Sequence, residues 1–81
     1  MTANELGMKL NAMYSMEKVN KTTMVHLFGV VYADIMRKEN IKPIEVVKIA
    51  GISENYQTEI SKGMRLAEYV TLKDEYKSVF N

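Results

Sequence analysis

The sequence of 81 residues contains no cysteine and no tryptophan, and it has only one proline and four glycines. Without cysteine, the chain has no disulfide bond, no thiolate metal ligand and no thiol nucleophile. So few prolines and glycines do not supply the frequent turns of a domain built from short strands. A chain of this length also has room for only one hydrophobic core. The sequence therefore predicts a single helical domain over residues 1–81.

The chain also lacks a strong excess of charge of either sign. Eleven basic and ten acidic residues give a net charge of +1, so the composition alone does not indicate a nucleic-acid partner. The single histidine, His26, has no companion at metal-ligand spacing, and the sequence holds no glycine-rich phosphate loop and no nucleophile motif. We therefore expect no enzymatic activity, no metal, no cofactor and no small-molecule ligand.

No segment has the pattern of a secretory signal or of a membrane span. The N-terminal residues are polar, with Glu5 early, and the longest apolar stretch covers only residues 24–36. His26, Gly29 and Asp34 interrupt that stretch, and it is too short to cross a bilayer. We expect a cytoplasmic protein with no membrane partner.

Hydrophobic residues recur at helical spacing along most of the chain. Asn4 is expected to cap the first helix, and the polar residues 20–23 separate it from the second. Pro43 suits the first turn of the third helix, and Gly51 suits its end in a left-handed conformation. The expected helices cover about residues 4–19, 23–38, 43–50 and 54–69, and a short final helix begins at Thr71 and carries Tyr76, Val79 and Phe80. The predicted fold class is a small all-α bundle of four to five helices.

Two glycines lie inside these expected helices. Gly29 lowers the intrinsic stability of the broadly apolar second helix, so we expect it to permit close contact with a neighbouring helix. Gly63 is expected to interrupt the fourth helix, and it offers an alternative, earlier end to the range 54–69.

One segment, about residues 43–61, carries a motif. A short helix is followed by a tight turn at Gly51 and by a second helix that Ser53 caps, with an apolar Val47 four residues before the glycine and Ile52 directly after it. This order resembles the helix-turn-helix of bacterial DNA-binding proteins. The match is partial, because members of that family commonly have Ala in place of Val47 and an apolar residue in place of Gln57. Tyr56 is the residue expected to take over that packing role.

The resemblance implies that the segment at about residues 43–66 binds double-stranded DNA, as part of a small dimeric transcriptional regulator. The second helix of the motif would then lie in the major groove. The residues implied to contact bases are Asn55, Gln57, Thr58 and Ser61, and those implied to contact phosphates are Lys42, Lys48, Lys62 and Arg65. Glu54 and Glu59 oppose this function, because carboxylates repel phosphate.

Two alternatives remain open at the level of sequence. A helix, a glycine turn and a capped helix also occur in helical domains that bind no nucleic acid, so the chain is alternatively a protein-interaction module or small regulatory inhibitor. The first helix, expected over residues 4–19, carries Met8, Met13 and Met16, and these unbranched side chains either fill the core or form the face of a homodimer, joined by Tyr76, Val79 and Phe80.

Overall fold

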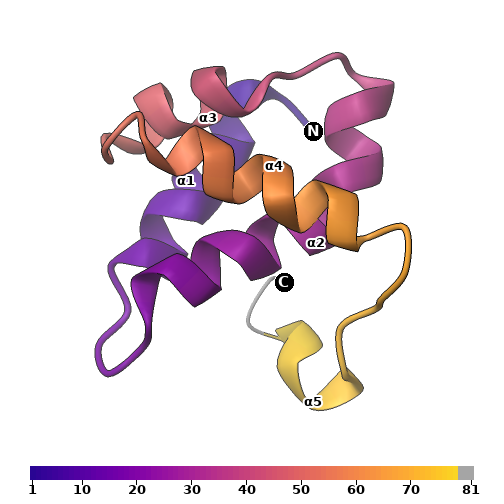
Figure 1. The fold of residues 1–81 in the computed structure, drawn as a ribbon. Coiled ribbons are helices and arrows are strands. Elements are labelled where there is room, and N and C mark those ends of the chain that lie inside the picture. Colours follow the sequence, from indigo (N-terminus) through magenta and orange to yellow (C-terminus); the bar gives the residue numbers. More distant parts are fainter. Residues whose placement is uncertain (79–81) are drawn as a thin grey trace.

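The structure, a computed structural model, describes residues 1–78, and over this range it contains helices and no strands. The described part confirms the all-α fold class (Figure 1). Val79 and Phe80, which were expected in the final helix, lie outside the described residues. The helices are α1 (Ala3–Tyr14), α2 (Lys21–Lys38), α3 (Pro43–Ala50), α4 (Tyr56–Leu66) and α5 (Asp74–Lys77).

Helix α1 begins and ends earlier than its hydrophobic pattern predicts. Thr2, not Asn4, caps it, because the Thr2 side chain accepts from the Glu5 N–H at 3.1 Å and Glu5 accepts from the Thr2 N–H at 3.2 Å. At the other end, the Lys21 ammonium donates to the carbonyl of Tyr14 and lies 4.3 Å from the centre of its ring. The expected extension to Val19 is wrong, since residues 15–20 form the turn that brings the chain back into α2.

Helix α2 is the longest helix of the described chain and lies at its centre. Its N-cap Asn20 accepts from the Thr23 N–H at 2.9 Å, and Arg37 and Lys38 stand in its last turn, where positive charge is favourable. The expected range 23–38 is therefore confirmed apart from two further residues at the start.

The core is formed by side chains from the first four helices. Helix α1 packs on α3, and α4 crosses α2. Asn11 on α1 donates to the carbonyl of Ala50 at 2.9 Å and so fixes the end of α3 against α1. The largest fully buried side chains are Phe28, Leu6, Leu10, Met36, Ile60, Val25, Val46 and Val47.

Two glycines allow α2 and α4 to cross at close range. A Cβ atom on Gly29 would overlap the carbonyl oxygen of Ile60 and would lie 3.0 Å from the Cα of Gly63, and a Cβ on Gly63 would overlap the carbonyl oxygen of His26. The close contact expected at Gly29 is thus confirmed. The interruption expected at Gly63 is wrong, because α4 continues to Leu66, where tertiary packing outweighs the low helix propensity of glycine.

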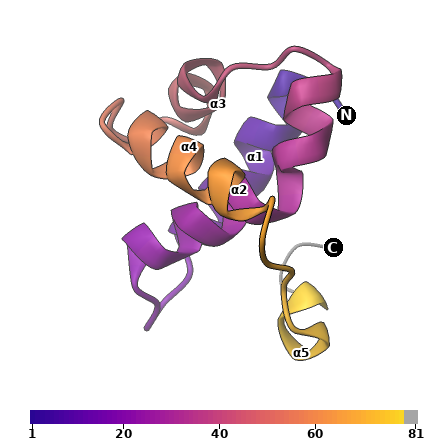
Figure 2. The ribbon, with the colours of Figure 1, turned by 45° about the vertical axis from the view of Figure 1, so that its right-hand side comes forward.

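The chain leaves the core after α4. Helix α4 ends at Leu66, three residues before the expected end at Tyr69, and residues 67–73 connect it to α5. Figure 2 shows α5 at the end of this connection, on the opposite side of the molecule from α3. None of the four residues of α5 is buried.

Candidate nucleic-acid interface

The turn between α3 and α4 begins with a hydrogen-bonded cap at the C-terminal end of α3. Gly51 has φ 74° and ψ 23°, in the left-handed region that an L side chain rarely adopts. Its N–H donates to the carbonyl of Lys48 at 3.2 Å, and the N–H of Ile52 donates to the carbonyl of Val47 at 3.3 Å. This is the Schellman pattern of hydrogen bonds, in which the residue after the glycine also contacts the last turn of the helix. The half-buried Ile52 and the buried Val47 both belong to the core, as the motif requires.

The start of α4 is less regular than expected. Glu54 and Asn55 form a turn, and α4 itself begins at Tyr56. Ser53 stands at the beginning of this turn, where its hydroxyl accepts from the Asn55 N–H at 3.3 Å and its carbonyl from the Tyr56 N–H at 3.0 Å. Ser53 therefore caps the turn that leads into the helix rather than the helix itself.

Tyr56 supplies the packing that the motif's polar Gln57 does not. The ring of Tyr56 is half-buried against the core and meets the ring of Tyr14 edge-on, with the ring centroids 5.3 Å apart and the planes at 77°. Tyr56 therefore lies on the same inward side of α4 as the buried Ile60 and Gly63.

The opposite face of α4 is open to solvent. Thr58 and Arg65, which are seven residues apart and so lie on nearly the same side of the helix, are both exposed. In Figure 1, α4 crosses the near side of the molecule in front of α2. A helix that packs on the core with one face and exposes the opposite face to solvent has the position that a groove-binding helix needs.

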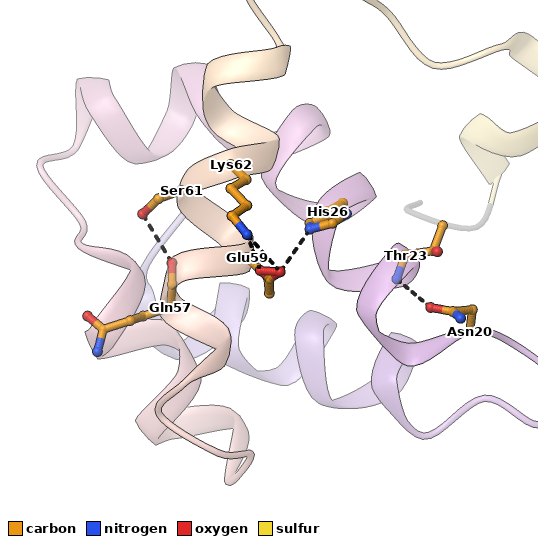
Figure 3. A network of polar contacts seen from close by, with 7 residues as sticks. All are labelled: Asn20, Thr23, His26, Gln57, Glu59, Ser61 and Lys62. Atoms are coloured by element: carbon orange, nitrogen blue, oxygen red, sulfur yellow. Dashed lines mark hydrogen bonds and ion pairs between the residues drawn. The ribbon is translucent and has the colours of Figure 1, made fainter.

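The structure exposes three of the four residues predicted to contact bases. Asn55, Gln57 and Thr58 are exposed at the start of α4, and Gln57 extends to the side of the helix away from His26 (Figure 3). Ser61 is half-buried, and its hydroxyl donates to the carbonyl of Gln57 at 3.0 Å. The hydrogen of Ser61 is therefore used within the helix, which leaves this hydroxyl as an acceptor only.

Glu59 lies between two basic groups on the side of α4 that faces α2 (Figure 3). Its carboxylate oxygens lie 3.3 Å from the Nε2 of His26 and 3.3 Å from the Nζ of Lys62. Burial of the carboxyl opposes ionisation, but the hydrogen bonds with Lys62 and His26 outweigh it and lower the pKa of Glu59 below its ordinary value. The negative charge of Glu59 is thus paired, whereas Glu54 is exposed in the turn before α4.

The residues predicted to contact phosphate occupy two helices. Lys48 is exposed on α3, and Lys42 is exposed immediately before it, with its N–H donating to the Glu45 carboxylate at 3.2 Å. Arg65 is exposed on α4, whereas Lys62 is held in the contact with Glu59.

Two further basic residues lie against α4 that sequence patterns did not indicate. His26 pairs with Glu59 across 33 positions of sequence, and Arg37 donates to the carbonyl of Met64 at 3.0 Å. Both come from α2, so only the crossing of the two helices brings them to α4, and neither has a local signal. A shallow hollow of about 370 Å³ lies beside α4 and is lined by His26, Lys62, Arg65, Leu66 and Tyr69.

The three methionines proposed as a dimer face are not brought together on the surface. Met13 is only 3% exposed and belongs to the core, whereas Met8 is 71% exposed and Met16 is 40% exposed. Met16 also lies in the turn after α1 rather than on the helix. A face formed by all three would require the core to open.

The described residues hold no group of three or more histidine, cysteine or acidic side chains that is placed to bind a metal ion. Among these same residues, no helix is both long enough and apolar enough to cross a membrane.

An all-helical domain with a capped α3–turn–α4 unit and an uncovered second helix has the construction of a helix-turn-helix domain. The chain matches the family model described as an HTH-like domain over residues 2–73, and it belongs to this family. The match extends from the N-cap of α1 to the residue before α5, so it covers the whole packed body and confirms the resemblance found in the shorter motif. No curated protein and no solved structure matches the chain.

Proposed function

We propose that this HTH-like domain binds double-stranded DNA through α3 and α4, with α4 in the major groove. The observation that carries the proposal is the α3–turn–α4 unit itself. The Schellman end at Gly51 fixes the turn after α3, and Tyr56 packs α4 on Tyr14 of α1. The close crossing at Gly29 and Gly63 holds α4 against α2, and the polar face of α4 stays uncovered. The membership of an HTH-like family supports the same function.

The residues divide into two roles. Asn55, Gln57 and Thr58 contact base edges, since amide side chains pair with adenine and a threonine methyl packs on thymine. Ser61 contributes only an acceptor. Phosphates are bound by Lys42, Lys48 and Arg65, and by Lys62 with Glu59 as its counter-charge.

The biological role that we propose is that of a small dimeric transcriptional regulator of bacterial type, which acts by occupying its site. The net charge of +1 gives little non-specific attraction to DNA, and two linked domains compensate because two half-sites are bound together.

The test is a selection from random DNA duplexes at low salt, followed by gel-shift titration of Gln57→Ala on the enriched sequence. We expect Gln57→Ala to lose about 5- to 100-fold in affinity for that sequence and to discriminate less against a base change in it. Asn4→Ala, an exposed amide on α1, is the control and leaves both properties unchanged. If no sequence is enriched, the proposed function is wrong.

A second candidate function is protein interaction without DNA binding. Exposed apolar side chains at the end of α4 and directly after it favour it, among them Leu66, Tyr69 and Val70. It predicts no retention of any duplex at low salt.

A further inference from the structure

One side of α2 is apolar but is not covered by the packed body of the domain. Leu27 and Val31 lie on the side of the helix turned away from Gly29, the residue through which α4 packs. Val30 and Ile35 border the same side, and all four side chains are half-buried. A helix that is apolar almost all round is normally enclosed on every side.

Within residues 1–78, the chain covers this side of α2 only thinly. Residues 70–72 run across this side of α2, and a hollow lies on each side of them, of about 600 Å³ and about 460 Å³. Both hollows include Val30, Val70 and Leu72 in their walls, so they form one surface divided by a ridge.

The rim of this surface adds further apolar area. Met16, Val70 and Tyr76 are 40%, 46% and 51% exposed, and each of them lines one or both hollows. A continuous patch of this kind on a small domain marks a site of association.

We propose that this surface, formed by the outer side of α2 and residues 70–77, binds the same surface of a second copy of the chain. The distribution of charge favours a second copy. Asp34 on α2 and Lys77 on α5 line the same hollow. Lys77 holds an exposed ion pair with Asp74 of its own helix, at 2.9 Å. In a two-fold pairing, a residue that contacts another in one direction also contacts it in the other, so a pairing in which Lys77 exchanges Asp74 for Asp34 of its partner makes that contact twice. One surface thus carries both halves of two ion pairs.

The position of the surface suits a DNA-binding dimer as well. It lies on the side of α2 away from Gly29, so a partner bound there does not cover the outward face of α4 with Thr58 and Arg65. The inference rests on the dimeric form of the proposed function, but it does not depend on DNA binding, because the association is measured without DNA.

The experiment compares the wild-type chain with two apolar-to-glutamate variants by sedimentation equilibrium, over a concentration series that reaches hundreds of micromolar. Val70→Glu places a charge inside the surface, and we expect it to weaken the dimer about 100-fold. Met8→Glu is the control, since Met8 is exposed on α1 and lines neither hollow, and it leaves the dimer intact. Circular dichroism shows whether each variant is folded.

A charge exchange tests the pairing itself and does not depend on the tolerance of Val70. Asp34→Lys weakens the dimer about 3- to 10-fold, and the added change Lys77→Glu restores it. A chain that stays monomeric throughout the series overturns the inference and leaves the surface to a different protein. A dimer that Met8→Glu disrupts and Val70→Glu does not also overturns it. If the dimer behaves as expected and no DNA sequence is enriched, the proposed function fails while this surface stands.

Discussion

At the scale of single residues, the candidate interface contains polar groups that form hydrogen bonds or ion pairs with one another. Asn11 satisfies the carbonyl of Ala50 at the end of α3, and His26 and Lys62 pair with Glu59. In each case a polar group has a partner within hydrogen-bonding distance. Without that partner, the carbonyl would destabilise the packing of α3 and the carboxylate would repel phosphate. The position of α4 and the electrostatics of its face are therefore set by the same few contacts.

The Glu59 contacts make stability depend on pH. The pKa of Glu59 is lower in the folded chain than its ordinary value of 4.5, because Lys62 and His26 stabilise the charged form more than burial opposes it. A carboxyl with a lowered pKa contributes stability that is present above its unfolded pKa and is lost as the pH falls through the folded pKa. We expect the wild-type free energy of unfolding to drop below pH 4.5, and the corresponding drop in Glu59→Gln to be smaller.

Urea titrations at a series of pH values measure this difference. Glu68→Gln, at an exposed carboxyl in the connection after α4, is the matched control. Its free energy of unfolding falls with pH by the same slope as that of the wild type. An identical slope in wild type and Glu59→Gln would show that the contacts with His26 and Lys62 do not persist in solution.

At the scale of helices, the crossing of α2 and α4 decides where the proposed DNA-binding face of α4 lies. The backbones approach so closely at Gly29 and Gly63 that there is no space for a methyl group on either residue. The crossing also brings Arg37 to the carbonyl of Met64. A change in the separation of these two helices would move the whole face of α4 relative to α3.

We expect Gly63→Ala to lower the free energy of unfolding by about 1–3 kcal/mol, because the added methyl overlaps the His26 carbonyl and forces the helices apart. This loss exceeds the gain of up to about 1 kcal/mol in helix propensity. Thr58→Ala, at an exposed position of the same helix, is the control. It gains helix propensity without a clash, so it does not lower the free energy of unfolding. Denaturant unfolding measures both variants, and equal effects would mean that the α2–α4 crossing is not close.

The same elements show what the sequence predicts and what it does not. The bounds of α3 are confirmed as Pro43–Ala50, because Pro43 and Gly51 mark its two ends locally. The end of α1 was placed too late because Val19 keeps helical spacing although it packs on the core from the turn.

In the candidate site, too, local features are predicted from the sequence and contacts between distant helices are not. Asn55, Gln57 and Thr58 were implied as exposed contacts by the resemblance to the helix-turn-helix, which rests on a short local motif, and the structure exposes all three. The pairing of His26 with Glu59 depends on the α2–α4 crossing, and no local pattern contains it.

At the scale of the whole molecule, the near-neutral charge sets an upper limit on how strongly salt affects DNA binding. Each protomer carries four candidate phosphate contacts, at Lys42, Lys48, Lys62 and Arg65. The logarithm of the binding constant falls with the logarithm of salt concentration by about 0.9 per neutralised phosphate, so we expect a slope no steeper than about −7 for a dimer. The contact between Lys62 and Glu59 reduces it further.

The slope also separates the contributions of the two proposed surfaces. Arg65→Ala removes one contact from each protomer and makes the dimer slope shallower by about 2, with a similar loss of affinity on every sequence. Lys9→Ala, on α1, is the control and leaves the slope unchanged. Val70→Glu keeps every phosphate contact of the single domain, so the monomer that it produces binds with about half the wild-type slope. Fluorescence anisotropy at several salt concentrations measures all three variants. If Val70→Glu is monomeric and retains the full slope, one domain makes all of the contacts, and DNA binding does not require the second copy.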